Sequence, residues 1–370
     1  MKVSDLPDSL PESGILEPAA LKLVAGLAES GAARLGDPAA LAHMDPPPPP
    51  IAATLAGLNA GLNQNLLHPD LSPFATEAER RVIAWLAPPF GMVTGQICAG
   101  SSIANLTALW CARESGARRV VASGDAHLSI RKAAHILAMP FEAVPVDAAG
   151  RLDPAHLPPT RDAVLVLTAG TTGRGVIDAL GPAEAAWLHV DAAWAGPLRL
   201  TRHGARLDGI DHADSVAISA HKWLFQPKDS ALILFADPAA PDAISFAGGY
   251  LAAPNVGVQG SRGAAAIPLL GTLLAWGRAG LAERIERCIA IGDDLAGRLA
   301  HDARVELKQF PETAVLTWRP SQGDPEATLG RLGRTASRTR IDGETWVRHA
   351  VANPFADIDL VWARIGAALG

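Results

Sequence analysis

Short apolar runs alternate with helix-like stretches through the middle of the chain. Six largely apolar runs have the length of a strand, and they lie at 118–123, 141–146, 163–169, 187–191, 215–220 and 231–237. Helix-like segments at 102–116 and 129–138 separate the first of them. Strands that are buried on both faces and alternate with helices are typical of a mostly parallel sheet. The pattern therefore predicts an α/β domain.

The region before this domain reads as a helical arm and a connecting segment. Residues 16–30 place leucine and valine at roughly helical spacing, and Pro46–Pro50 must form a stiff stretch. We interpret the stiff stretch as a spacer between arm and body. Residues 75–86 form an amphipathic pattern, in which Thr76 has the position of an N-cap and Glu79 completes a capping box.

The pattern changes after Pro254. Residues 264–300 predict one long helix or two consecutive helices. Strand-like runs follow at 304–310, 314–318 and 345–351, and the helical segment 357–369 closes the chain. We expect a boundary near Gly260. The predicted organisation is an arm and spacer at 1–50, a large α/β domain at 51–260, and linking helices with a small α+β domain at 261–370.

Composition narrows the class of protein. The chain has 370 residues, of which 49% are hydrophobic and 19% charged, so it can bury a sizeable core. Its net charge of −6 argues against broad binding to nucleic acid. No apolar run approaches the roughly eighteen residues of a membrane span, and the N-terminal residues lack the pattern of a signal peptide. Three cysteines without a CxxC motif argue against a disulfide scaffold or thiolate zinc site and fit a reducing cytoplasm.

Two charged residues close apolar runs. Asp191 ends the run in HVDAAW, and Lys222 follows the next run in SAHKW. Alone, such an Asp is more often a cap and such a Lys more often a surface residue. Together they favour pyridoxal phosphate, because a buried Asp needs a cationic partner and a buried Lys likewise needs a group that compensates for its burial. The Asp would hold the ring nitrogen protonated, and the Lys would form a Schiff base with the aldehyde.

Several motifs in a fixed order carry a family resemblance. They are AHMDPPPPP, AGSSIANLTAL, DAHLSIRKAA, AGTTGRGVID, HVDAAW, SAHKW, QGSRGAAAIPLLGTLLAWGRAG and WVRHAVANP. With them the chain resembles the group II pyridoxal-phosphate-dependent amino-acid decarboxylases, relatives of the aromatic-amino-acid and glutamate decarboxylases. The resemblance implies a fold-type-I architecture: a large domain with a mostly parallel seven-stranded sheet, a small C-terminal α+β domain and an N-terminal helical arm. It implies pyridoxal 5'-phosphate as the cofactor.

The resemblance also implies roles for residues around the cofactor ring. Lys222 would form the internal aldimine and Asp191 would bind the pyridinium nitrogen. His127 would stack on one face of the ring and Ala193 would pack against the other, while Thr172 would lie beside the cofactor. From the sequence alone, a satisfied core histidine is an equally good interpretation of His127.

The phosphate and the substrate would be held by other residues. By resemblance, Ser101 and Ser102 would cradle the phosphate with the help of Ser219. Free N–H groups and two hydroxyls at a helix N-terminus also form an anion site on physical grounds, although the serines can equally be simple caps. Arg348 would reach the substrate carboxylate through paired hydrogen bonds; its alternative is a surface arginine on a strand.

The chain is shorter than the family pattern in two places. The family usually runs well beyond 370 residues, so this is a shortened member. Between Asp178 and His189 there is room for a helix of only about two turns. After Asp237, the long loop whose tyrosine is thought to protonate the substrate carbon is short, and the chain's single tyrosine, Tyr250, stands outside the expected position. The catalytic tyrosine is therefore expected to be missing.

These features predict a homodimeric decarboxylase of an L-amino acid. The apolar arm, which has no core of its own, and the family's shared active sites favour the dimer. Fold does not fix reaction, so another carbon–carbon lyase, an aldolase or an aminotransferase on the same fold stays open, as does a non-catalytic relative that binds the cofactor. The chain has no HExxH, GxGxxG or GxxxxGK[ST] motif to favour a metal or nucleotide site.

Overall fold

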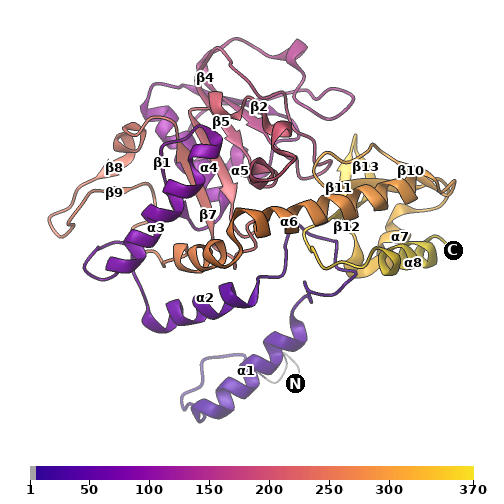
Figure 1. Ribbon diagram of the computed structural model, residues 1–370, viewed down its shortest axis with the longest axis horizontal. Coiled ribbons are helices and arrows are strands. Elements are labelled where there is room, and N and C mark those ends of the chain that lie inside the picture. Colours follow the sequence, from indigo (N-terminus) through magenta and orange to yellow (C-terminus); the bar gives the residue numbers. More distant parts are fainter. Residues whose placement is uncertain (1–5) are drawn as a thin grey trace.

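A seven-stranded sheet forms the centre of the molecule (Figure 1). The structure is a computed structural model, and it describes residues 6–370. In order across the sheet the strands are β1 (Thr94–Cys98), β7 (Ala231–Phe235), β6 (Ser215–Ser219), β5 (Ala185–Asp191), β4 (Thr160–Thr168), β2 (Arg119–Ser123) and β3 (Phe141–Val144). Only β7 runs antiparallel to its neighbours. The predicted mostly parallel sheet is confirmed.

Helices cover both faces of this sheet, which explains why its strands are apolar throughout. The helices are α1 (Glu17–Gly31), α2 (Pro50–Leu62), α3 (Pro73–Leu86), α4 (Ser101–Glu114), α5 (Leu128–Ile136), α6 (Ala266–Ala300), α7 (Pro325–Leu332) and α8 (Ile358–Leu369). Residues of α4 and α5 pack with one face of the sheet, and residues of α3 and α6 pack with the other. All residues of β6 and β7 are buried, as expected for strands covered on both faces.

A second sheet lies in the C-terminal part of the chain. It is antiparallel, in the order β10 (Val305–Leu307), β11 (Val315–Pro320), β13 (Glu344–Ala350) and β12 (Ser337–Ile341). Helices α7 and α8 accompany it, and the long helix α6 leads into it (Figure 1). The helix α6 is kinked at Gly277, whose φ of 59° and ψ of −174° are not helical. Both predicted forms, one long helix and two consecutive helices, thus describe part of what is found.

Some predicted local features are wrong. The third helix begins at Pro73 after Ser72, and Glu79 does not cap it; Glu79 instead forms a double hydrogen bond with Arg262, at 2.5 and 2.7 Å. Residues 178–184 contain no helix, since this stretch is irregular up to the start of β5. The strands β1 and β12 and the helix α7 were not predicted.

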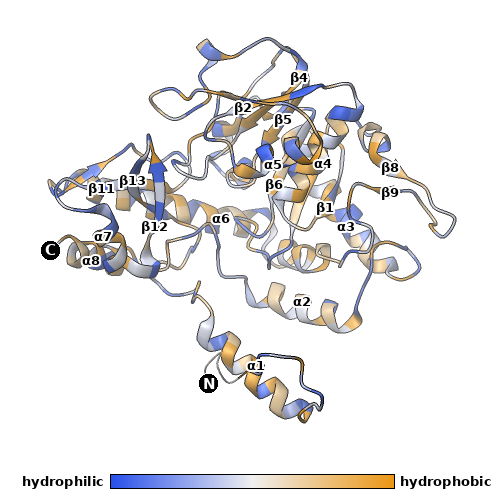
Figure 2. Ribbon diagram, turned by 180° about the vertical axis from the view of Figure 1, so that it is seen from behind, coloured by the Kyte–Doolittle hydropathy of each residue, from blue (hydrophilic) through white to orange (hydrophobic). Residues whose placement is uncertain are grey.

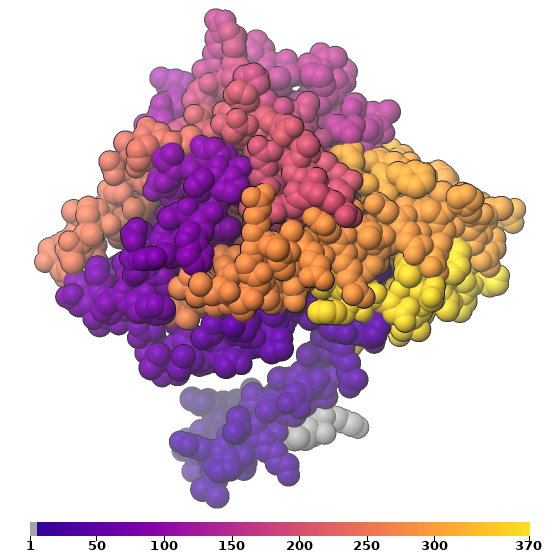
Figure 3. Space-filling view, viewed as in Figure 1, coloured from indigo at the N-terminus to yellow at the C-terminus, as the bar shows by residue number. Residues whose placement is uncertain are grey.

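The segment between α1 and α2 is not a free linker. Its residues contact the C-terminal sheet and the following turn: Leu41 O accepts a hydrogen bond from Ala350 N, and Pro38 O accepts one from Asp357 N. Pro50, the last proline of the run, is the first residue of α2. The helix α1 itself buries no residue and stands apart from the body in Figure 3.

None of the helices in residues 6–370 is both long and apolar enough to cross a membrane. The three cysteines, Cys98, Cys111 and Cys288, are buried and unbridged.

Candidate active site

The polar residues predicted for the site lie at the carboxyl ends of parallel strands. Asp191 is the last residue of β5, and Thr168, the last residue of β4, pairs with it in register. Lys222 follows the end of β6 by three residues, and His127 follows the end of β2 by four. In open α/β sheets, crevices at this edge are the usual ligand sites. The fold therefore brings together residues that are far apart in the sequence.

Asp191 is a buried carboxylate without a cationic partner among the described residues. It is 3% exposed. Its Oδ1 accepts a hydrogen bond from Ala193 N at 3.1 Å, and its Oδ2 accepts one from Asn105 Nδ2 at 3.0 Å. A buried ionised carboxylate is costly unless it is hydrogen-bonded and paired with a cation. The two N–H donors meet the first need, and a protonated ring nitrogen would meet the second.

Lys222 lies close enough to Asp191 for their charges to interact. Burial lowers the pKa of Lys222, and attraction to Asp191 offsets part of this effect. A lowered pKa raises the fraction of neutral amine, which is the form that attacks an aldehyde. No hydrogen bond or ion pair within residues 6–370 engages Lys222 Nζ, so the amine is available for such a bond.

His127 is the third titratable residue of this group. It is the N-cap of α5, where its Nδ1 accepts a hydrogen bond from Ser129 N at 3.2 Å and contacts Ser129 Oγ at 2.8 Å. Burial lowers the pKa of His127, and the charges of both Asp191 and Lys222 act on it. Ala193 lies two residues after Asp191 and is buried, and its O accepts a hydrogen bond from Ser219 N.

The predicted phosphate site is the N-terminus of α4. Ser101 and Ser102 are the first two residues of this helix, and the preceding residue, Gly100, has a φ of 88° and provides no capping side chain. The serines are thus not the caps of the alternative interpretation, and the first-turn N–H groups have no side-chain partner. A Cβ on Gly100 would lie 3.7 Å from His221 Cε1, so that ring lies against the helix start.

His221 adds a buried ring nitrogen that the sequence interpretation did not assign to the phosphate. Its Nε2 contacts Ser219 Oγ at 3.1 Å, whereas its buried Nδ1 has no partner within the described structure. Burial lowers the pKa of His221 to about 4, so the ring is neutral at pH 7. An unpartnered buried nitrogen beside an uncapped helix N-terminus fits an anionic group such as a phosphate.

Arg348 is a buried cation held by oxygens of three different segments. Its Nη1 donates to Thr172 O at 2.9 Å, its Nε to Ser337 Oγ at 3.0 Å and its Nη2 to Ala42 O at 3.2 Å. No carboxylate of residues 6–370 pairs with it within 4 Å, and burial lowers its pKa. The alternative of a surface arginine is therefore wrong. Because Arg348 also influences the pKa of Lys222, its charge acts on the same site.

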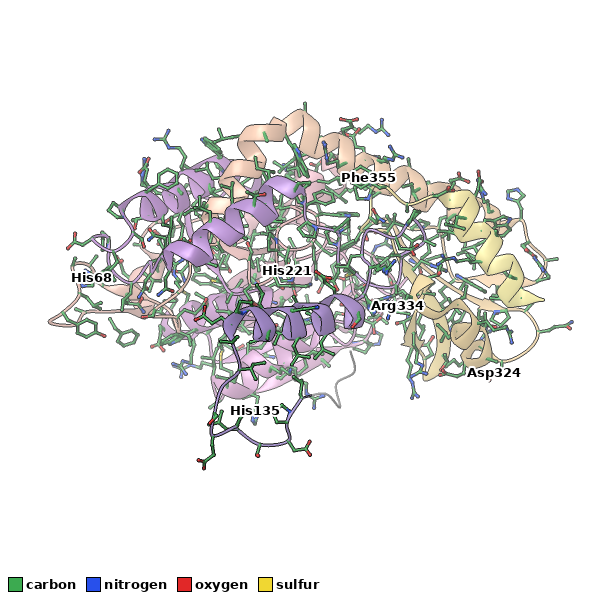
Figure 4. All side chains as sticks on the ribbon, turned by 90° about the horizontal axis from the view of Figure 1, so that it is seen from below. His68, His135, His221, Asp324, Arg334 and Phe355 are labelled. Carbon is green, nitrogen blue, oxygen red and sulfur yellow. The ribbon has the colours of Figure 1, made fainter. Side chains whose placement is uncertain are left out.

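The segment where the family's catalytic loop would lie is a short hairpin. It consists of β8 (Ser245–Phe246) and β9 (Asn255–Val256) with the connection between them. Tyr250 in this connection is 72% exposed, and its carbonyl oxygen contacts His68. In Figure 4, His68 lies at one edge of the molecule and His221, the neighbour of Lys222, lies in the middle. Within one chain, the tyrosine is thus remote from Lys222.

The comparisons with known proteins identify the family. Residues 49–319 match the model described as the pyridoxal-dependent decarboxylase conserved domain, so the chain belongs to this family. The resemblance read from the motifs is confirmed, and with it pyridoxal phosphate as the cofactor. The buried carboxylate, the available amine and the unpartnered nitrogen beside α4 fit that cofactor.

The relatives are amino-acid decarboxylases by name. An L-2,4-diaminobutyrate decarboxylase of Rhizobium meliloti (strain 1021) is 36% identical over 319 residues, which cover 75% of this chain and 64% of the relative. The matched region is thus less than two thirds of that relative's length. A probable L-tyrosine/L-aspartate decarboxylase of Methanopyrus kandleri is 31% identical over 355 residues, 88% of this chain and 94% of the relative.

A solved structure confirms the fold. The crystal structure of Oryza sativa TDC with PLP and tryptamine has a TM-score of 0.89 and covers 99% of this chain, and 90% of that chain is covered. At 22% identity it supports the predicted fold-type-I architecture and nothing finer.

Proposed function

We propose that the chain binds pyridoxal phosphate through Lys222 and decarboxylates an L-amino acid. The observation that carries the proposal is the buried carboxylate of Asp191, which has no cationic partner in residues 6–370 and lies within charge range of an available amine. Family membership and the decarboxylases among its relatives support the reaction. Bound pyridoxal phosphate supplies an electron sink for the electron pair left at the α-carbon when carbon dioxide departs.

Each residue of the site has a task in this proposal. Asp191 keeps the proton on the ring nitrogen, which is the charge that makes the ring an electron sink. Lys222 attaches the cofactor aldehyde through Nζ. His127 packs against one ring face and Ala193 against the other. We also propose Thr172 as a neighbour of the cofactor, because its carbonyl holds Arg348 at the same place.

The phosphate and the substrate carboxylate would occupy two cationic or donor-rich places. We propose that Ser101, Ser102 and Ser219 bind the phosphate, with His221 Nδ1 as a further partner. Arg348 would bind the α-carboxylate of the substrate, since three neutral oxygens orient its guanidinium without cancelling its charge.

The test of the reaction is a substrate panel. The purified protein, loaded with cofactor, is incubated with L-amino acids that include 2,4-diaminobutyrate, aspartate and tyrosine, while carbon dioxide and amine are measured. Borohydride reduction followed by peptide mapping should place the cofactor on Lys222, and Lys222→Ala should lose both the label and the activity. Label on Lys228 or Lys132 contradicts the proposed site. Keto acid without carbon dioxide would indicate an aminotransferase, and labelled protein without any product a non-catalytic relative.

We also propose that the protein is a homodimer. Helices α1 and α2 present apolar side chains to solvent, among them Leu21, Val24, Leu58 and Leu62, each more than half exposed. Figure 2 shows these apolar stretches on both helices. An isolated helix without a buried residue is not expected to be stable by itself, so a second copy is the natural partner for this surface.

Sedimentation tests the dimer. The double variant Leu21→Glu/Val24→Glu should weaken association, because two charges would be buried in an apolar contact. Lys22→Glu, on the same helix and also exposed, is the matched control and should leave association unchanged. A wild-type protein that is monomeric at micromolar concentration with cofactor bound would contradict the dimer.

A further inference from the structure

Behind Asp191, one face of β5 carries a row of buried polar side chains. Trp187, His189 and Asp191 alternate along the strand, so they point to the same face of the sheet. Hydrogen bonds join them through Ser215 of β6 and Asn105 of α4. His189 and Ser215 are fully buried and Asn105 is 1% exposed. Buried groups of this kind must satisfy one another, because an unmade hydrogen bond costs the full desolvation of the group.

The direction of these hydrogen bonds is fixed at Trp187. Its indole N–H can only donate, and it lies 2.8 Å from Ser215 Oγ. The hydroxyl hydrogen of Ser215 is then available to His189 Nδ1, 2.9 Å away. His189 Nε2 lies 3.1 Å from Asn105 Oδ1, which can only accept, so Nε2 carries the hydrogen of the ring. Burial lowers the pKa of His189 to about 4, so the ring is neutral at pH 7.

The orientation of the Asn105 amide follows from its contact with His189 and determines which atom faces Asp191. With its oxygen held by His189, its Nδ2 donates to Asp191 Oδ2 at 3.0 Å and to Ser129 Oγ at 2.9 Å. A reversed amide would place an oxygen against the carboxylate and would need the hydrogen on His189 Nδ1. Ser215 Oγ would then face two donors, and its own hydrogen would have no acceptor among the described side chains. In the reversed amide, the oxygen of Asn105 would also lie 3.0 Å from Asp191 Oδ2, and two oxygens at this distance need a hydrogen between them. The reversed amide is therefore compatible only with a protonated Asp191.

The far end of the network has a second fixed donor. The backbone N–H of Ser129 points to His127 Nδ1 at 3.2 Å, and Ser129 Oγ lies 2.8 Å from the same nitrogen. Since Ser129 Oγ accepts from Asn105, its hydroxyl hydrogen is free to donate to Nδ1. The neutral ring of His127 therefore carries its hydrogen on Nε2. Both ends of the network enforce one direction.

We propose that His189 is a positioning residue that fixes the amide of Asn105 and thereby keeps Asp191 ionised and His127 in its Nε2–H form. The proposal rests on the proposed function in one respect, that Asp191 faces the ring nitrogen of the cofactor. Asn105 Nδ2 and Ala193 N both donate to Asp191, so each carboxylate oxygen already accepts one N–H hydrogen bond, an arrangement that suits the ionised group. A proton between Asp191 and the ring nitrogen then stays on the ring.

Two amide substitutions of His189, which differ in length, distinguish a role in orienting Asn105 from a role in filling space. His189→Gln keeps an N–H donor at the distance of Nε2 and can still hold Asn105 Oδ1. His189→Asn keeps a polar group near Ser215 but is too short to reach Asn105. Both variants are loaded with pyridoxal phosphate labelled with ¹⁵N in the ring, and the protonation of this nitrogen is measured by NMR together with cofactor affinity.

The expected result is a clear difference between the two variants. His189→Gln should match the wild type, with a protonated ring nitrogen and an affinity within about threefold. His189→Asn should lose part of the ring protonation and bind the cofactor roughly ten- to a hundredfold more weakly, the loss expected for one hydrogen bond to a charged group. A folded His189→Asn variant with the ring protonation and affinity of His189→Gln would overturn the proposal.

A measurement on the cofactor-free protein distinguishes this proposal from the proposed function. Labelled histidine should show His189 and His127 neutral at pH 7 with hydrogen on Nε2. A charged His189, or hydrogen on its Nδ1, would overturn the network even if Lys222 carries the cofactor. The expected tautomers in a protein that fails to load cofactor would support the network and reject the function.

Trp187→Phe decides the matter if His189→Asn does not fold. It keeps an aromatic ring but removes the fixed donor to Ser215, so part of the His189 population should move its hydrogen to Nδ1. Because Ser129 also holds the Asn105 amide from the other end, the tautomer shift is expected to be partial. A His189 tautomer that moves while the cofactor ring nitrogen keeps its full protonation would overturn the proposal, because the ring proton would then not depend on His189.

Discussion

The structure predicts that Asp191→Asn lowers both the stability and the activity of the protein. The carboxylate accepts two hydrogen bonds, one on each oxygen, from Ala193 N and Asn105 Nδ2. An asparagine has one oxygen, so one of these donors would face an NH2 group, and a donor pair of this kind costs about 1–3 kcal/mol of stability. The larger expected loss is that of the negative charge which we propose holds the ring proton. Removing one preorganised electrostatic contact of a transition state typically lowers kcat by about 10²–10³, or about 2.7–4 kcal/mol.

The assay must separate this loss of rate from a loss of cofactor. Initial rates are measured at saturating pyridoxal phosphate, and the loaded fraction is determined from the visible absorbance. Asp214→Asn is a matched control, because that carboxylate also accepts a backbone N–H, from Leu188 at 2.7 Å, but precedes β6 at the opposite edge of the sheet. We expect unchanged kcat in the control. A fully loaded Asp191→Asn variant with wild-type kcat would refute the role given to this carboxylate.

The remaining predictions concern stability, pH and product. Glu79→Gln should lower the free energy of unfolding by about 3–5 kcal/mol in urea titrations, because it leaves the largely buried Arg262 without its charge partner; an unchanged midpoint would show that the pair contributes nothing. Burial lowers the pKa of Lys222, so the apo-protein binds fewer protons than the unfolded chain below the ordinary lysine pKa of about 10.4, and its stability should rise with pH through that window. The rate of cofactor capture should rise with the neutral amine and level off below pH 10.4; a midpoint at or above this value would contradict the lowered pKa. Because Tyr250 is exposed in a short hairpin, carbonyl product should accompany the amine, and fast turnover to amine alone would show that another group, or one from a second subunit, protonates the substrate carbon.

The sequence predicted the parts of the fold that depend on local pattern. Strands such as β6 and β7 are apolar at nearly every position, and helices separate the early strands, so a parallel sheet covered on both faces was foreseeable. The strand β1 escaped because TGQIC is short and contains glycine and glutamine, and it is defined by its pairing with β7. The helix expected before β5 is absent because Asp178 fixes its segment, with Leu152 N and Thr168 N donating to the carboxylate.

The role of Glu79 was also predicted wrongly, because its actual partner is distant in the sequence. Its spacing from Thr76 satisfied a capping box, and nothing in the local sequence contradicts that role. Its partner, Arg262, lies 183 positions away, and a bidentate pair with a largely buried guanidinium outweighs a helix cap. When a local motif and a distant charge compete for one carboxylate, the sequence indicates the local motif but not the distant partner.

The site was predictable to the extent that its residues close strands. Asp191 and Lys222 follow buried strands of one parallel sheet, so their meeting at one edge follows from topology. Asn105 shows why the rest was not predictable. An asparagine in the middle of an apolar helix normally lowers helix propensity, and its sequence neighbourhood gives no partner. Its partners on β5 and α5 exist only once α4 packs on the sheet.

Arg348 is a second residue whose surroundings could not be read from the sequence. In the sequence, the arginine of WVRHAVANP fits a surface strand as well as a substrate site, and the structure excludes the surface position because Arg348 is buried. Oxygens from Thr172, Ser337 and Ala42 hold its guanidinium, and these belong to the loop after β4, to β12 and to the segment before α2. All three are neutral, so they orient the cation and leave its charge for another partner. A motif identifies a residue that can bind a carboxylate, whereas three converging segments determine that it is buried, oriented and still charged.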